Sequence, residues 1–122
     1  MTANIKKYIK NYPKSNYYVR GTFTALNKDF VNDIQHWLDL GFQRISMEPA
    51  VEKYGKRAIQ ESDLETLHNE YWRLAKLYDS KREVGQGFEF FHFNLNAQNG
   101  PCLPKRLTGC GAGYEYMVVT PT

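Results

Sequence analysis

The chain has 122 residues, of which 42% are hydrophobic, 15% aromatic and 24% charged, and its formal net charge is +3. This composition is that of a globular protein and excludes a disordered chain. The charge is too mild for a nucleic-acid signature, and no apolar run approaches the roughly 18 residues that span a bilayer. We therefore expect no nucleic-acid partner and no membrane partner. No secretory signal is visible, so a cytoplasmic location is the default expectation.

The N-terminal region predicts a short helix followed by a strand. Residues 5–10 form an amphipathic pattern that ends before Pro13. Residues 17–24 are rich in β-branched and aromatic side chains, which favour a strand. Alternate residues of a strand share a face, so one face would carry four polar side chains: Tyr18, Arg20, Thr22 and Thr24. An arginine on such a face could bind a carboxylate ligand or pair with an acid such as Glu48.

The next segments complete a strand–helix–strand unit. Apolar residues recur every fourth position in a helix of about 13 residues, at Phe30, Ile34 and Leu38. Asn27 could cap this helix and Gly41 could end it. Residues 42–47 predict a second strand, closed by Glu48 and Pro49. This order is typical of two parallel strands joined by a helical crossover.

A third helix and a third strand are expected further along the chain. Ser62 and Glu65 fit a capping box at the start of the helix. Its apolar stripe has 3-4-3 spacing: Leu64, Leu67, Tyr71, Leu74 and Tyr78. Gly85 is placed to end the helix. Residues 88–95 predict a strand with rings on both faces, in which His92 fits a core histidine better than a ligand.

Both cysteines fall in a segment rich in glycine, proline and asparagine, residues 96–113. Thiolates at Cys102 and Cys110 are soft ligands for zinc, copper(I) or an iron–sulfur cluster, and glycines let the backbone wrap such a group. On spacing alone, free or structural thiols are the favoured interpretation, because a closed four-thiolate site needs two more sulfurs than the chain has. Residues 114–120 predict one more strand, whose hairpin partner is missing.

Several segments together resemble a known enzyme family. The segments YYVRGTFTA, ISMEP, FFHFNLN and GPCLPKRLTGCGAGYEYMVVTP resemble radical S-adenosylmethionine enzymes with a SPASM domain, and most closely those that form thioethers in SCIFF peptides. The resemblance implies an α/β fold. Residues 1–99 would be the C-terminal part of a (β/α) barrel, and residues 100–122 a Cys/Gly-rich loop and the first strand of a SPASM hairpin. The Cys-x₃-Cys-x₂-Cys motif of this family is absent from the chain, which is therefore expected to be a fragment.

The resemblance also implies roles for particular residues. Arg20, Thr22, Thr24 and Glu48 would border the S-adenosylmethionine pocket. Cys102 and Cys110 would ligate an auxiliary [4Fe–4S] cluster. The complete enzyme would cleave S-adenosylmethionine, abstract hydrogen from a cysteine-rich precursor peptide and join a cysteine sulfur to an α-carbon. The expected partners are that peptide and the remainder of the barrel. No catalytic residue is assigned, and the isolated chain is expected to be inactive.

Two alternatives remain open from the residues. The chain could be a non-catalytic module that binds a peptide by adding a strand to an open sheet edge. It could also be an inert truncated product that associates with itself through exposed edges and aromatic surfaces.

Overall fold

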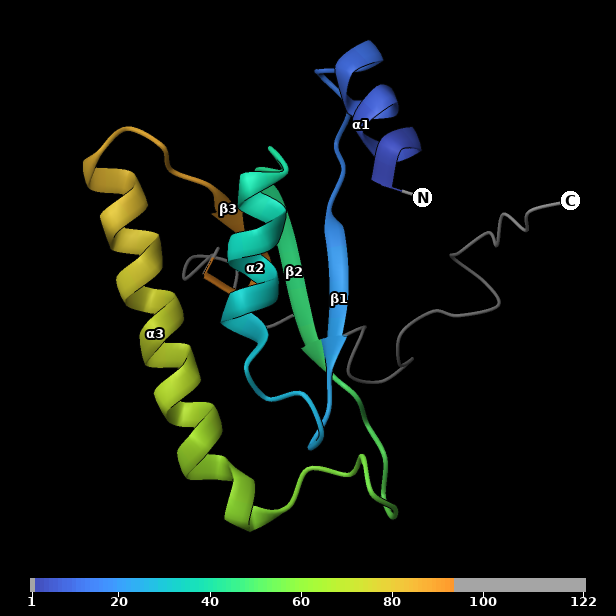
Figure 1. Ribbon diagram of the computed structural model, residues 1–122, viewed down its shortest axis with the longest axis vertical. Helices are drawn as coiled ribbons and strands as arrows, with labels where there is room; N and C mark the ends of the chain where they lie inside the picture. Colours follow the sequence, from blue (N-terminus) through green and yellow to red (C-terminus); the bar gives the residue numbers. More distant parts are fainter. Residues whose placement is uncertain (1, 94–122) are drawn as a thin grey trace, which may run out of the picture.

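The computed structural model describes residues 2–93 and contains a small, fully parallel sheet with helices. The strand order is β1-β2-β3, and both strand pairs are parallel. The expected α/β class and the parallel strand–helix–strand unit are therefore confirmed (Figure 1). The elements are α1 (Thr2–Asn11), β1 (Val19–Phe23), α2 (Phe30–Asp39), β2 (Arg44–Pro49), η1 (Glu61–Asp63), α3 (Leu64–Glu83), β3 (Glu89–Phe90) and η2 (Phe91–Phe93). No helix among the described residues is long and apolar enough to cross a membrane.

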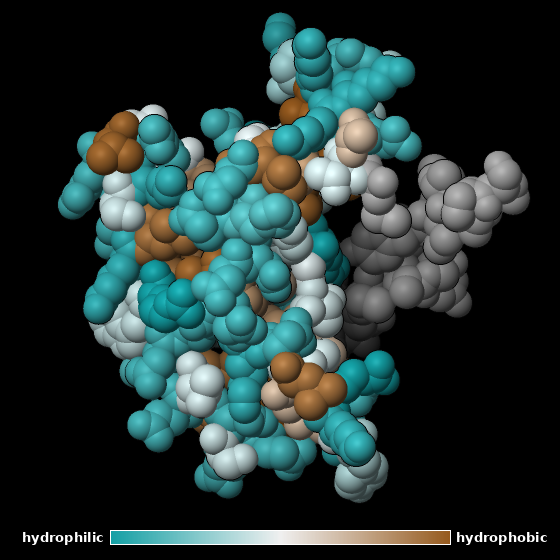
Figure 2. All heavy atoms as spheres, in the orientation of Figure 1, coloured by the Kyte–Doolittle hydropathy of each residue, from teal (hydrophilic) through white to brown (hydrophobic). Residues whose placement is uncertain are grey.

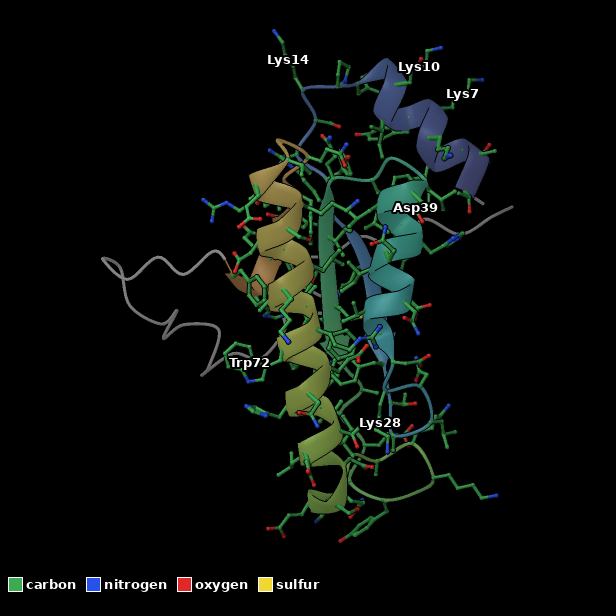
Figure 3. The ribbon with its side chains drawn as sticks, turned by 60° about the vertical axis from the view of Figure 1, so that its left-hand side comes forward. Lys7, Lys10, Lys14, Lys28, Asp39 and Trp72 are labelled. Carbon is green, nitrogen blue, oxygen red and sulfur yellow. The ribbon has the colours of Figure 1, made fainter. Side chains whose placement is uncertain are left out.

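Helices α2 and α3 lie side by side over one face of the sheet (Figures 1 and 3). The sheet contributes Phe23, Ile45 and Met47 to the interior between these layers. The helices and the segment around β3 contribute the remaining buried side chains: Phe30, Val31, Ile34, Leu67, Leu74, Phe88 and Phe90. The outer surface of this side is largely hydrophilic (Figure 2). Within the described part of the chain, the core therefore lies on the helix-bearing face of the sheet.

Gly21 permits the close approach of α2 to β1. A Cβ atom at this position would lie 2.5 Å from the Trp37 ring and 2.9 Å from the Met47 sulfur. Glycine in a strand interior commonly marks such a close approach. The glycine therefore provides space for the indole on the helix-bearing face.

The N-terminus of α2 is capped from a distant element, which corrects the prediction for Asn27. Asn27 Oδ1 instead accepts hydrogen bonds from the backbone and hydroxyl of Thr24 at 2.9 and 2.6 Å. The buried carboxylate of Glu70, on α3, accepts a hydrogen bond of 2.9 Å from the backbone amide of Val31 in α2. Glu70 also pairs with Arg73 at 2.7 Å. A negative charge at this position complements the positive end of the helix dipole.

The capping box of α3 also lies elsewhere than predicted. A short 3₁₀ turn, η1, precedes the helix, and Gln60 and Asp63 form the capping box in place of Ser62 and Glu65. The predicted apolar stripe is largely confirmed, although Leu64 at its start is 55% exposed. The predicted ends of α2 and α3 agree with the left-handed glycines that follow them, Gly41 at φ +89° and Gly85 at φ +71°.

The third strand is shorter than predicted, because the chain turns after Phe90. β3 has two residues, and η2 follows at once. In a 3₁₀ turn, residues three apart lie above one another, whereas in a strand they would point to opposite faces. This allows the rings of Phe90 and Phe93 to pack at 4.9 Å. Residues 94–95 of the predicted strand, and all of residues 100–122, lie outside the described residues.

Candidate ligand-binding face of the sheet

The sheet face that α2 and α3 leave uncovered carries polar side chains from β1 and β2. Because Ile45 and Met47 point to the helices, Ser46 and Glu48 point to the opposite face. In the parallel register, Arg20 lies opposite Ser46 and Thr22 opposite Glu48. Arg20 and Thr22 thus share one face, as the alternation along the strand predicted, and Glu48 lies on the same face. Glu48 is near the carboxyl end of β2, the end at which parallel α/β folds place ligands.

Three side chains converge on one oxygen of Glu48. The Ser46 hydroxyl donates a hydrogen bond to Glu48 Oε1 at 2.9 Å. His92 Nε2 lies 2.9 Å from the same oxygen, and Arg20 Nη2 lies 3.9 Å from it. The histidine contact becomes an ion pair only when the imidazole is protonated. The Arg20 side chain remains 66% exposed, so its guanidinium can still contact a ligand.

His92 is a site residue that the sequence analysis missed. Its position among phenylalanines indicated a core histidine, but the side chain is 37% exposed and bound to Glu48. The turn of η2 places it there, since β2 and η2 are in contact. Within the sequence, the one signal available was the polar ring in an otherwise apolar F-H-F run.

The turn at η2 also covers part of the polar face. The ring of Phe91, which follows β3, packs edge-on against the ring of Tyr18, which precedes β1, with 5.5 Å between the ring centroids. The Tyr18 hydroxyl donates a hydrogen bond to Glu89. Ser46 lies in the middle strand and is 5% exposed. The accessible part of the face is therefore the part around Arg20, Thr22 and Glu48.

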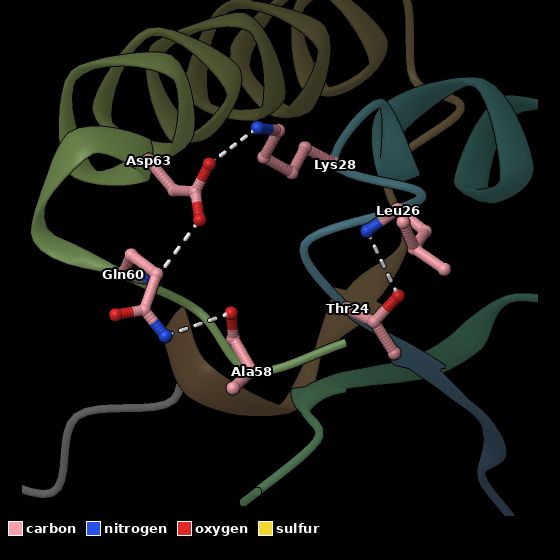
Figure 4. A network of polar contacts seen from close by, with 6 residues as sticks. All are labelled: Thr24, Leu26, Lys28, Ala58, Gln60 and Asp63. Carbon is pink, nitrogen blue, oxygen red and sulfur yellow. Dashed lines mark hydrogen bonds and ion pairs between the residues drawn. The ribbon is translucent and has the colours of Figure 1, made fainter. Parts of the chain in front are cut away.

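Thr24 does not share the environment of the other three predicted residues. It follows the last residue of β1, and its hydroxyl donates a hydrogen bond to Asn27. The same hydroxyl accepts a hydrogen bond from the Leu26 amide at 3.1 Å (Figure 4). Its side chain is thus engaged in the turn between β1 and α2. Its role here is to shape the rim of the face.

That rim is formed by two loops that are bonded to each other. The Ala25 amide donates to the Arg57 carbonyl at 3.1 Å. Lys28 pairs with Asp63, which also accepts the Gln60 amide at 2.9 Å (Figure 4). The Lys28 ammonium, helped by the Gln60 amide, lowers the pKa of Asp63 below its ordinary value. The carboxyl edge of β1 and β2 is therefore bounded by a fixed polar network.

The charge of Glu48 also acts on the helix layer. Burial, and to a smaller extent the Glu48 carboxylate, raises the pKa of Tyr71 on α3. Chemically, the face offers an exposed guanidinium, a hydroxyl and a carboxylate held by two donors. This set suits a ligand with a carboxylate group and a second polar group. Among the described residues, no three His, Cys, Asp or Glu side chains form a group that could hold a metal ion.

The two predicted cluster ligands, Cys102 and Cys110, lie outside the described residues. A comparison with protein-family models found no match to this chain. A comparison with curated proteins found none either.

Proposed function

We propose that the chain is part of a radical S-adenosylmethionine enzyme of the SPASM class, and that its polar sheet face borders the cofactor. The supporting observation is the division of the parallel sheet into two unlike faces. Parallel sheets of α/β proteins are covered on both faces, and in a (β/α) barrel the helices are outside and the strand ends border the site. A polar face opposite α2 and α3 fits the inner wall of such a barrel.

In this proposal Arg20 binds the carboxylate of the amino-acid part of S-adenosylmethionine. A guanidinium fork matches a carboxylate in geometry and charge. Arg20 has the required exposure, and the one ion pair that it forms among residues 2–93, with Glu48 at 3.9 Å, is weak. Thr22 lies next to it on the same face, and Glu48 fixes the border of the pocket through Ser46 and His92.

The rest of the activity requires groups that this chain does not supply alone. The radical-generating cluster would be held by a Cys-x₃-Cys-x₂-Cys motif, which is absent from the sequence. Cys102 and Cys110 are proposed ligands of an auxiliary [4Fe–4S] cluster, which takes four thiolates, so further ligands are needed. The proposed substrate is a cysteine-rich precursor peptide that receives thioether cross-links, and the chain by itself is proposed to be inactive.

Titration with S-adenosylmethionine, followed by calorimetry, tests the cofactor part of this proposal. The wild-type chain should bind, and Arg20→Gln should weaken binding about 10-fold or more, since a hydrogen bond to a charged group contributes about 1.5–3 kcal/mol. Arg82→Gln is the matched control, because it removes the same charge from the far end of α3. Equal affinities of the two variants, or no binding by the wild-type chain, would contradict the proposal.

Reconstitution with iron and sulfide tests the cluster part. Iron and acid-labile sulfide bound per chain should fall when Cys102 and Cys110 are replaced by alanine. Production of 5′-deoxyadenosine by the reconstituted chain alone would refute the proposal that this chain is inactive by itself.

A further inference from the structure

Arg20 and His92 reach the same oxygen of Glu48 from the two sides of β2. β2 is the middle strand of the sheet, Arg20 lies on β1, and His92 lies in η2, directly after β3. Arg20 Nη2 is 3.9 Å from Glu48 Oε1, and His92 Nε2 is 2.9 Å from it. One carboxylate therefore stands between a permanent cation and a side chain whose charge depends on pH.

The contact with Glu48 fixes which nitrogen of the His92 ring carries the hydrogen. A carboxylate accepts hydrogen bonds and cannot donate them, so Nε2 is the donor. The Ser46 hydroxyl donates to the same oxygen, as expected of an ionised acceptor. Protonation at the other ring nitrogen turns this hydrogen bond into an ion pair without breaking it. The side chain of His92 is 37% exposed, so it can exchange protons with solvent.

The other titratable and charged groups of this region keep their charge near neutral pH. They come from four elements: Tyr18 before β1 and Arg20 on it, Glu48 on β2, Glu89 on β3, and Tyr71 on α3. Burial, and less strongly Glu48, raises the pKa of Tyr71, which therefore stays neutral. The neighbouring rings of Phe90 and Phe91 carry no charge. Histidine is the side chain in this set that changes charge between about pH 5 and 8.

We propose that protonation of His92 switches the polar face to a state that binds carboxylate ligands more tightly. While His92 is neutral, the charge of Glu48 attracts the Arg20 guanidinium and repels a ligand carboxylate. The imidazolium neutralises Glu48, leaves the guanidinium available to the ligand and adds positive charge to the face. Affinity for a carboxylate ligand therefore rises as the pH falls. The inference rests on the proposed function, because it concerns the charge of the same pocket.

Calorimetric titration of the full chain with S-adenosylhomocysteine, at about pH 8 and at about pH 5.5, tests the proposal. The wild type should bind about 3–5-fold more tightly at the lower pH, which is the range expected of a partly exposed ion pair. 5′-Methylthioadenosine lacks the carboxylate, so its affinity should be equal at the two pH values. An equal pH effect on both ligands would overturn the proposal.

Two histidine variants assign the effect to one ring. His92→Gln keeps a hydrogen-bond donor for Glu48 but cannot be protonated, so its affinity should not depend on pH. His68→Gln is the matched control, because His68 lies on α3 and accepts the indole N–H of Trp72 at 3.2 Å, and this variant should keep the pH dependence. A pH dependence that survives in His92→Gln would overturn the proposal. Binding by the wild type that does not depend on pH would overturn it while leaving the cofactor proposal intact.

An NMR titration without ligand separates this inference from the proposed cofactor. The Arg20 Nε–Hε signal should shift over the same pH range as the His92 ring signals, and this shift should disappear in Glu48→Gln. An Arg20 signal that does not follow His92 would overturn the switch. If the signal does follow His92 but S-adenosylhomocysteine binds at neither pH, the switch stands and the proposed cofactor is wrong.

Discussion

The two faces of the sheet carry opposite kinds of side chain although they are built from the same strands. On one face, Phe23, Ile45 and Met47 are almost fully buried under α2 and α3. On the other, Arg20 and Thr22 are exposed, and Glu48 is held by polar contacts alone. The first face accounts for the stability of the fold. The second contributes little burial, and its arginine and carboxylate are the groups that the proposed function assigns to the cofactor pocket.

The largest expected effect compares the same residue type on the two faces. Phe30 is 0% exposed and packs against Phe23 at 4.7 Å, so Phe30→Ala should lower the free energy of unfolding by about 3–5 kcal/mol. Phe91 is 52% exposed, and its contact with Tyr18 is an edge-on pair, so Phe91→Ala should cost about 1 kcal/mol. Urea unfolding measures both values. Similar costs would mean that the polar face is also part of the core.

A second comparison uses the carboxylate of Glu70, which caps α2, and that of Glu48, which lies on the polar face. Glu70→Ala leaves the buried Val31 amide without its acceptor and removes one of the two acceptors of Arg73, so it should cost about 2–3 kcal/mol. Glu48→Ala should cost less, about 1 kcal/mol, since Arg20 and His92 can turn to water and the Ser46 hydroxyl is the one buried group that loses its acceptor. Thermal melts at constant pH provide the measurement. If Glu48 proves as costly to remove as Glu70, its network is structural rather than functional.

Adjacent residues of β1 give the sharpest local comparison, because they point to opposite faces. Gly21→Ala should destabilise by about 1–2 kcal/mol, since the new methyl group meets the Trp37 ring. Thr22→Ala should change stability by about 0.5 kcal/mol at most, because Thr22 is exposed. Urea unfolding measures the change in stability of both variants. A tolerated alanine at Gly21 would show that α2 is not packed closely on this strand.

The smallest expected effect concerns the rim of the polar face and depends on pH. The depressed pKa of Asp63 means that its bond to Lys28 stabilises the folded state above the ordinary carboxyl pKa of about 3.9. This contribution is lost as the pH falls through the lower, folded-state pKa. The Asp63→Asn variant lacks this contribution at every pH. The free energies of unfolding of wild type and variant should therefore converge in acid. Curves that stay parallel down to strong acid would argue against the Lys28 bond.

The sequence analysis predicted the features that depend on local periodicity. The crossover helix between residues 17–24 and 42–47 required parallel strands, and β1 and β2 do pair in parallel. Alternation along the first strand placed Arg20 and Thr22 on one face, and the register of β1 with β2 in the structure adds Glu48 to that face. Glycines at the helix ends were recognised because few other residues adopt a positive φ.

The features that the sequence analysis missed depend on contacts between distant segments. Glu70 caps α2 from another helix, and no local pattern identifies that pair. His92 reaches Glu48 because the chain turns at η2, and a run of aromatic residues predicts a strand more readily than a turn. The roles of Cys102 and Cys110 stay predictions, since both lie outside the described residues.

The most direct test of the central claim is an NMR titration of the full chain with S-adenosylhomocysteine, a stable analogue of the cofactor. If the polar face borders the cofactor, amide shifts should concentrate at Arg20, Thr22, Ser46 and Glu48 and disappear in Arg20→Gln. Shifts confined to the outer surfaces of α2 and α3, or no shifts at saturating analogue, would contradict the account.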